Sequence, residues 1–451
     1  MREVDDSSHN VKAVLLLSLL VNYNKFEFQN PYQNRVEDFV NEGAIQSITR
    51  SIGFACAHAR DRYVAVQDDT PEGWGLTTAL VYVGLRSLTP EAKRKPPPSE
   101  DEAKRLFSSL PSDEASILLP TYSFIYSNKL FASIFISTSS QTSKETPIAA
   151  FLSLASYLSH HAYRSDRCLR YTILSLLTIQ SLVEDAVNIK RLSSDQSKTS
   201  IRLCRQRAPS SPLITSDRTP ASATLDICSD LISHNLRRRL DIPLYSLTIG
   251  IILRISTQLS HNKTRLQHHW SYLWATLFSL MRFLTQYAKD LSSVTEIQSQ
   301  LCAPLTQLIA FCLSAGDTFL PNPSDYDDLF YKLIEVGTPL LTRFRDSYFP
   351  PPNTTNTPKA PSHSHPASSP ASIRILISVC THYSSLVASQ SQTRKITPHA
   401  VQEVIKQGYE TLSIEGGEGL AEWEAWREKG PWKAEVKRLV RTVVEDVRGM
   451  R

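Results

Sequence analysis

Residues 266–284 read L-Q-H-H-W-S-Y-L-W-A-T-L-F-S-L-M-R-F-L. Apolar side chains recur every three or four positions in this stretch and just beyond it, in the series Leu266, Trp270, Leu273, Leu277, Leu280, Leu284 and Leu291. This spacing is typical of an α-helix with one buried face, because 3.6 residues make one helical turn. Such a helix needs a neighbouring element to cover its apolar stripe. The stretch therefore predicts a helix packed among other helices.

Similar stripes recur through most of the chain. A second one consists of Leu329, Leu333, Val336, Leu340 and Phe344, and further helices are expected over 11–23, 36–60, 73–88, 117–137, 148–163, 167–190, 225–240 and 244–260. Later helices begin near Pro370, Pro398 and Pro431, since proline in the first turn loses no needed donor. No strict repeat period accompanies them. The predicted fold class is all-α: an irregular armadillo- or HEAT-like α-solenoid of stacked helical pairs.

The helix expected over 117–137 has an alternative. Phe131, Ile134, Phe135 and Ile136 would fit a β-strand as well, and periodicity does not distinguish the two for a short apolar run.

Breaks in the pattern indicate how the chain is divided. Proline and polar residues concentrate in 90–113, 193–223 and 349–370, which predicts loop insertions at the first two and a disordered linker at the third. The expected organisation is a disordered N-terminus over 1–10, an armadillo-like helical domain over 11–348, that linker, and a C-terminal helical cap over 371–451.

Composition is that of an ordinary folded protein, with 41% hydrophobic and 21% charged residues. A net charge of +5 over 451 residues is too small to indicate a nucleic-acid partner. Seven scattered cysteines without a C-x-x-C pair favour buried cytosolic thiols. The N-terminus lacks a basic leader, and the most apolar runs, 14–21 and 244–253, fall short of the roughly 20 residues that span a bilayer. Any membrane contact is expected to be peripheral.

Catalytic, metal and cofactor motifs are absent from the sequence. It contains no G-x-x-x-x-G-K-[ST] loop, no H-E-x-x-H and no G-x-S-x-G. The pairs His160–His161 and His268–His269 are adjacent, and neighbours on a helix point about 100° apart, which is poor geometry for one metal. We expect no enzyme activity, no catalytic residue, no metal and no cofactor.

Clustered arginines form the candidate binding site. One group is Arg237, Arg238 and Arg239, and a second group in the preceding segment is Arg202, Arg205 and Arg207. Guanidinium groups bind phosphate bidentately, so an acidic-partner or phosphoinositide patch is one interpretation. The other is complementation of a helix C-terminus and a solvated face. Trp423 and Trp426 are either a partner anchor or, as we favour, core residues packed on the final helix.

From Val11 the chain reads V-K-A-V-L-L-L-S-L-L-V-N-Y-N-K-F-E-F-Q-N-P-Y, which resembles the C-terminal domain of the armadillo-like helical domain-containing protein 3 family, especially its fungal members. The residues that carry the likeness are Asn22, Tyr23, Lys25, Phe26, Glu27, Asn30, Pro31 and Tyr32. The segments 202–209, 234–241 and 269–284 are also similar, and the resemblance covers about 11–350. On physical grounds, the turn around Pro31 is expected to lock one helix pair rather than to contact a ligand.

The resemblance implies a cytoplasmic scaffold that associates peripherally with the Golgi membrane, with a Golgi phosphatidylinositol 4-kinase and an Arf exchange factor as protein partners. Family members carry further helical repeats before this domain, so partner residues in those repeats have no counterpart to transfer. Two other functions stay open. One is a karyopherin-like or other cargo-binding solenoid with an acidic or asparagine-lined groove, and the other is an enzyme with an unfamiliar helical fold and a deep reactive pocket.

Overall fold

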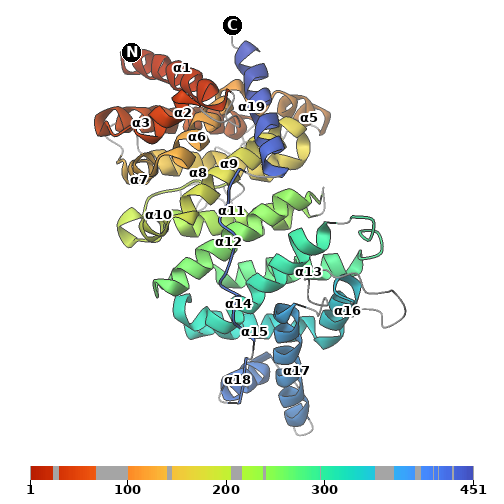
Figure 1. Ribbon diagram of the computed structural model, residues 1–451. Helices are drawn as coiled ribbons and strands as arrows, with labels where there is room; N and C mark the ends of the chain where they lie inside the picture. Colours follow the sequence, from red (N-terminus) through yellow and green to blue (C-terminus); the bar gives the residue numbers. More distant parts are fainter. Residues whose placement is uncertain are drawn as a thin grey trace, which may run out of the picture. The chain divides into compact units, whose positions relative to one another are not determined.

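The structure is a computed structural model built almost entirely of helices (Figure 1). It describes residues 2–23, 30–67, 100–139, 145–204, 216–236, 240–294, 296–350, 370–391, 398–409, 411–414, 416–428 and 431–449. Within these ranges the only β-pairing is an isolated bridge between Thr199 and Arg218. The predicted all-α class is confirmed.

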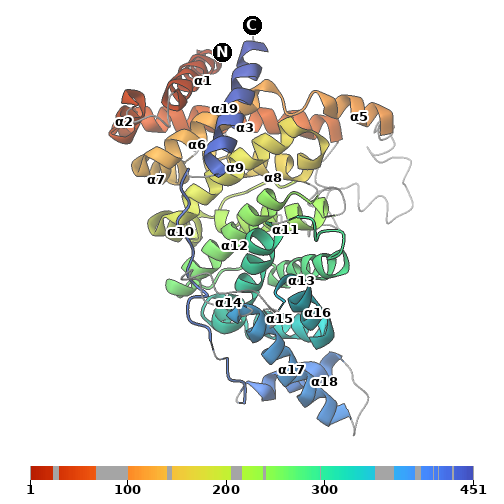
Figure 2. The same ribbon diagram turned by 45° about the vertical axis from the view of Figure 1, so that its right-hand side comes forward.

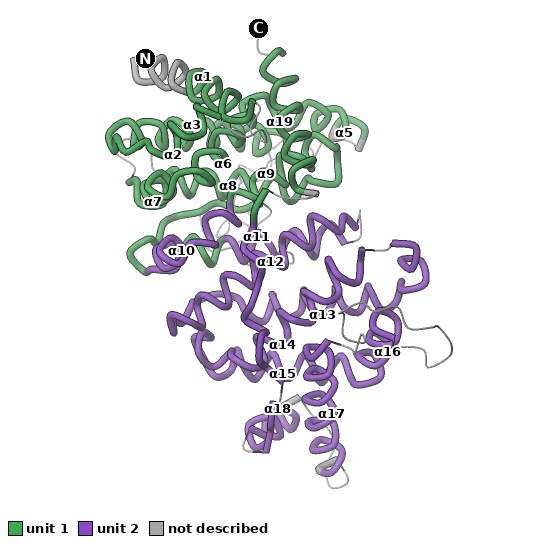
Figure 3. The backbone as a smooth tube through the Cα atoms, in the orientation of Figure 1, with its two compact units in different colours: residues 1–178, 195–223, 427–451 green, residues 179–194, 224–426 purple. Residues whose placement is uncertain are grey.

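The chain forms two compact units (Figure 3). Unit 1 contains residues 1–178, 195–223 and 427–451, and unit 2 contains residues 179–194 and 224–426. Both units are therefore assembled from segments that are separated in the sequence.

Unit 1 is built on α3, which packs on α1, α7 and α8. Its helices are α1 (Arg2–Asn22), α2 (Pro31–Glu37), α3 (Glu42–Gln67), α5 (Glu100–Ser108), η3 (Asp113–Ile117), α6 (Leu118–Ser127), α7 (Lys129–Ser137), α8 (Pro147–His161), η4 (Ala162–Arg164), α9 (Asp166–Glu184, to residue 178), η5 (Asp195–Ser197) and α19 (Pro431–Gly449). Gly53 of α3 faces Pro147 of α8 so closely that an added Cβ would lie 2.8 Å from the Pro147 Cα. The glycine therefore permits this close helix contact.

Unit 2 stacks α12 on α14 and α13 on α15. Its helices are α10 (Ala186–Leu192), α11 (Pro220–Asn235, from residue 224), α12 (Ile242–His261), α13 (Trp270–Gln286), the π-helix η6 (Gln298–Cys302), α14 (Ala303–Phe319), α15 (Pro323–Val336), α16 (Thr338–Tyr348), α17 (Ala371–Ser391) and α18 (Pro398–Gly408). The first predicted stripe becomes α13, with Trp270 and Trp274 fully buried and stacked 5.3 Å apart. The predicted apolar stripe extends too far, however, because α13 ends at Gln286 and Leu291 lies in a turn beyond it.

The segment 117–137 is helical, and it is two helices rather than one. Asn128 has an extended backbone between α6 and α7, and its side chain accepts from the Phe131 amide at 2.8 Å. Its Nδ2 also donates to the carbonyls of Val36 and Phe39, at 2.7 and 2.8 Å. The break between α6 and α7 is thus stabilised by hydrogen bonds to the end of α2 and the turn after it. The local apolar periodicity of residues 117–137 does not reveal this break.

The remaining boundaries differ from the expected organisation in four places. Helix α1 begins at Arg2 rather than near residue 11, since residues 2–10 contain no proline or glycine. The insertion over 90–113 contains α5, and the insertion over 193–223 contains η5 and the start of α11. Residues 371–451 do not form one cap, because α17 and α18 belong to unit 2 and α19 to unit 1. The expected helix over 73–88 and the linker over 351–369 lie outside the described residues.

Three described helices are long and apolar enough to cross a membrane, judged by length and composition alone. They are Ile242–His261, Gln298–Phe319 and Ala371–Ser389, and the bent pair of α9 and α10 would be a fourth if it counts as one span. The expectation that every apolar run falls short is therefore wrong. The apolar windows of the three helices are 78%, 61% and 39% buried within the structure, so the surface of the first is mostly covered by other helices.

Candidate functional site

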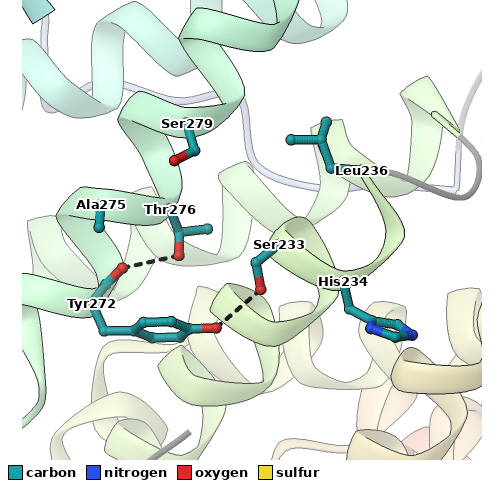
Figure 4. Close-up of a pocket in the computed structure, with 7 residues that line it drawn as sticks. All are labelled: Ser233, His234, Leu236, Tyr272, Ala275, Thr276 and Ser279. Carbon is teal, nitrogen blue, oxygen red and sulfur yellow. Dashed lines mark hydrogen bonds between the residues drawn. The ribbon is translucent and has the colours of Figure 1, made fainter. Parts of the chain in front are cut away.

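A pocket of about 460 Å³ opens in unit 2 between the end of α11 and the middle of α13 (Figure 4). Its described lining residues are Ser233, His234, Leu236, Tyr272, Ala275, Thr276 and Ser279. The Ser233 Oγ and the Tyr272 hydroxyl lie 3.0 Å apart. Hydroxyl groups both donate and accept hydrogen bonds, so this wall suits a small polar ligand or a polar side chain.

Among the described lining residues, Ser233 does not have the surroundings of an activated nucleophile. A nucleophilic serine needs a base within hydrogen-bond reach of its hydroxyl. The Ser233 hydroxyl lies against Tyr272 instead, and the neighbouring His234 ring points away from that pair (Figure 4). The arrangement fits binding better than catalysis.

Of the six predicted arginines, the structure describes only Arg202. Its Nε donates to the Tyr157 hydroxyl at 3.1 Å within unit 1. The predicted partners Arg205, Arg207, Arg237, Arg238 and Arg239 lie outside the described residues. The acidic-partner or phosphoinositide patch therefore stays a prediction.

Among the residues of the N-terminal sequence motif, Asn30 has the clearest structural role. Its Oδ1 accepts from the Tyr32 amide at 2.9 Å, which caps α2, and its Nδ2 donates to the carbonyls of Leu20, Val21 and Tyr23 at 3.1, 2.7 and 2.7 Å. Asn30 thereby ties the end of α1 to the start of α2. Asn22 contributes to the same unit by donating to the Ser123 hydroxyl at 2.9 Å. Lys25, Phe26 and Glu27 lie outside the described residues.

All seven cysteines are buried. Burial raises the pKa of the Cys168 thiol to about 11. The hydrogen bond with Tyr63 acts in the opposite direction and lowers this pKa, but its effect is smaller than that of burial. A thiol with so high a pKa is a poor nucleophile and a poor metal ligand at neutral pH. Within the described ranges, no three histidine, cysteine or acidic side chains are grouped as a metal site would require.

A charged pair in unit 2 was not anticipated from the sequence. Glu184, at the end of α9, accepts a hydrogen bond from the Nε of Arg254 on α12. Burial lowers the pKa of Arg254, and the Glu184 carboxylate counteracts this shift. The sequence does indicate that Arg254 has a charged partner. Arg254 is a single cation inside the apolar run I-I-L-R-I, and a charge in such a run is buried only when it is paired.

Both tryptophans of the 423–426 segment bind at this pair. The Trp423 Nε1 donates to Glu184 at 3.2 Å, its ring lies 5.6 Å from the Arg254 guanidinium, and the Trp426 amide donates to Glu184 at 3.1 Å. For Trp423 the favoured interpretation, packing on the final helix, is therefore wrong about the hydrogen-bond partner of its side chain, which is Glu184. The Glu184 carboxylate is half-buried, and the Trp423 indole and the Trp426 amide supply donors to it in addition to Arg254.

Comparisons with known proteins give one family. The family model described as "Armadillo-like helical domain-containing protein 3, C-terminal" matches residues 218–449, and so extends well beyond residue 350. A Schizosaccharomyces pombe protein described as a UPF0588 membrane protein is 31% identical over 71% of this chain and 52% of its own length. The human and zebrafish armadillo-like helical domain-containing proteins 3 are each 23% identical over 98% of this chain and 67% and 68% of theirs.

The chain spans about half the length of the S. pombe relative. No solved structure matches it.

Proposed function

Because the chain belongs to the armadillo-like helical domain-containing protein 3 family, we propose that it is a non-catalytic helical scaffold that binds trafficking and lipid-kinase machinery at the Golgi membrane. The observation that carries the proposal is the family match over residues 218–449. Its partners would be a Golgi phosphatidylinositol 4-kinase and an Arf exchange factor, which the sequence resemblance implies.

The packing of reactive groups supports a scaffold rather than an enzyme. All cysteines are buried, and Ser233 of the unit 2 pocket lies against a tyrosine rather than a base. Stacked helices present long outer faces, which suit protein binding.

Membrane association would be peripheral. The word "membrane" in the description of the S. pombe relative supports proximity to a bilayer. The helix α12, one of the three that are long and apolar enough to span, packs largely inside the protein, so its apolar character does not require a bilayer. The predicted phosphoinositide patch, Arg237–Arg239, would supply a contact with anionic headgroups.

Localisation and affinity purification test the proposal together. A tagged full-length chain should overlap with a Golgi marker, and mass spectrometry of the purified material should show a phosphatidylinositol 4-kinase and an Arf exchange factor above the level of a tag-only control. A uniformly dispersed chain that enriches neither class of factor contradicts the proposal.

A cargo-binding solenoid is the second candidate, and one observation favours it. The side-chain amide of Gln307 on α14 donates to two backbone carbonyls of residues 420 and 422, and an amide side chain can hold the main chain of an extended peptide through the same kind of hydrogen bond. Enrichment of the tagged chain at the nuclear envelope, with nuclear cargo in the purified material, would favour this candidate over the first.

A further inference from the structure

Residues 416–426, which we call the strap, lie along unit 2 after α18 (Figures 1 and 2). Between residues 422 and 426 the strap has neither helix nor strand. Leu420 is buried, Trp423 and Trp426 are half-buried, and the residues between them are exposed. Every third side chain of this stretch therefore faces the protein.

The strap is held mainly through its backbone. The Gln307 Nε2 donates to the carbonyls of Leu420 and Glu422, at 3.0 and 2.8 Å. The Arg254 Nη2 donates to the carbonyl of Glu424 at 2.9 Å. Three alternate carbonyls thus accept from two side chains, and any sequence in the same conformation would offer the same carbonyls.

The anchoring side chains add a sequence requirement. Trp423 lies near Arg254 and donates its indole N–H to Glu184, and Leu420 fills a buried position three residues earlier. Trp426 follows three residues later. The surface formed by the side chains of Glu184, Arg254 and Gln307, which we call the strap site, therefore fits a segment of the pattern Leu-x-x-Trp-x-x-Trp.

Removing the strap would leave no buried charge without a partner. Glu184 and Arg254 bond directly to each other, so both stay paired when the tryptophans leave. A segment held by three inward side chains and a few hydrogen bonds opens at lower free energy than the whole unit unfolds. The strap can therefore leave this surface while unit 2 stays folded.

We propose that the strap site is a peptide-binding site which the chain's own strap occupies, and that a partner protein binds it with a Leu-x-x-Trp-x-x-Trp segment that displaces the strap. The proposal rests on the scaffold function and names one of its binding surfaces. The strap is covalently attached and therefore competes with a partner peptide at a high effective concentration. This competition lowers the apparent affinity of the site for the partner peptide.

Fluorescence anisotropy with a labelled peptide of residues 416–426 tests this. The full-length double variant Leu420→Ser, Trp423→Ser should bind the peptide at least tenfold more tightly than the unchanged chain. Adding Gln307→Ala to that variant should weaken binding about tenfold, since two hydrogen bonds are lost. Adding Gln298→Ala, an exposed glutamine on η6, should leave binding unchanged, and a peptide with both tryptophans replaced by alanine should not bind.

Equal binding by the double variant and the unchanged chain, with circular dichroism showing both folded, overturns the proposal. If the double variant does not fold, hydrogen exchange on the unchanged chain decides. Excess peptide should speed exchange of the amides of residues 420–426, and exchange that occurs only with global unfolding contradicts a displaceable strap. Golgi localisation does not depend on these results, so the scaffold function can stand where this inference fails.

Discussion

The Nε of Arg167 donates to both carboxylate oxygens of Asp446, at 3.0 Å each, although the two residues are 279 positions apart. Arg167 lies at the start of α9, and Asp446 lies near the end of α19. The same guanidinium bonds to Asp113 at 2.7 Å, and the Tyr171 hydroxyl donates to Asp446 at 2.5 Å. This network fastens the last helix within unit 1.

Asp446→Ala should destabilise unit 1. The change removes the acceptor of the Tyr171 phenol and one of the acceptors of the partly buried Arg167 guanidinium, which keeps Asp113, and we expect a loss of about 1–3 kcal/mol in the free energy of unfolding. Urea denaturation followed by circular dichroism measures it. Glu445→Ala removes an exposed carboxylate one residue earlier and should change the midpoint little; equal effects of both variants would argue against the network.

Gly53→Ala should be destabilising, and Gly43→Ala on the same helix should not. The added methyl at position 53 would meet the Pro147 backbone, and overpacking of this kind costs about 1–3 kcal/mol. At position 43 the nearest atom lies 3.6 Å away, so alanine should stabilise α3 by roughly 0.5–1 kcal/mol through its helix propensity. Thermal midpoints of the two variants should therefore move in opposite directions.

Asn30→Ala should loosen the junction of α1 and α2. It removes an N-cap and the donors to three carbonyls, and loss of an N-cap alone costs about 0.5–2 kcal/mol. Hydrogen exchange should rise in residues 30–37 before it rises in α8. Gln33→Ala, whose side chain bonds only to the exposed Glu37 among its described contacts, provides the control. Unchanged protection of 30–37 in Asn30→Ala would contradict the role of Asn30.

Alkaline pH should weaken the fold through Cys168. Burial raises the pKa of this thiol from 9.0 to about 11, so the folded state keeps a proton that the unfolded state releases. Its contribution is fully present below pH 9 and is lost as the pH rises to about 11. The thermal midpoint of Cys168→Ala should fall less steeply over this window than that of the unchanged chain, and parallel slopes would contradict the assignment.

The helices could be predicted from the sequence wherever burial is periodic. Leu273, Leu277 and Leu280 lie on one face of α13 because their spacing matches the helical turn, and proline at the first turn correctly marks Pro398 and Pro431. The break at Asn128 could not be predicted in this way, since its side chain bonds to a turn some 90 residues earlier.

The strap and its contacts were harder to predict, because they too depend on residues that are far apart in the sequence. Gln307 contacts the strap through backbone carbonyls, and Glu184 contacts it partly through the Trp426 amide; backbone contacts of this kind leave no pattern in a sequence. The strap itself has no helical period, so Trp423 and Trp426 could only be assigned to a neighbour by proximity in the chain. Among the predicted arginines, Arg202 donates a hydrogen bond to Tyr157, which lies 45 positions away in the sequence. The residues next to Arg202 in the sequence do not indicate this partner.

The division of unit 1 has a consequence for biosynthesis. Its residues 427–451 leave the ribosome only after every residue of unit 2 has been made. Domains generally fold in the order in which they are translated. Unit 2 can therefore be complete before unit 1 is. At that stage the part of unit 1 that has already been made exposes the surface that α19 later covers. A nascent chain with such an exposed surface is expected to bind chaperones.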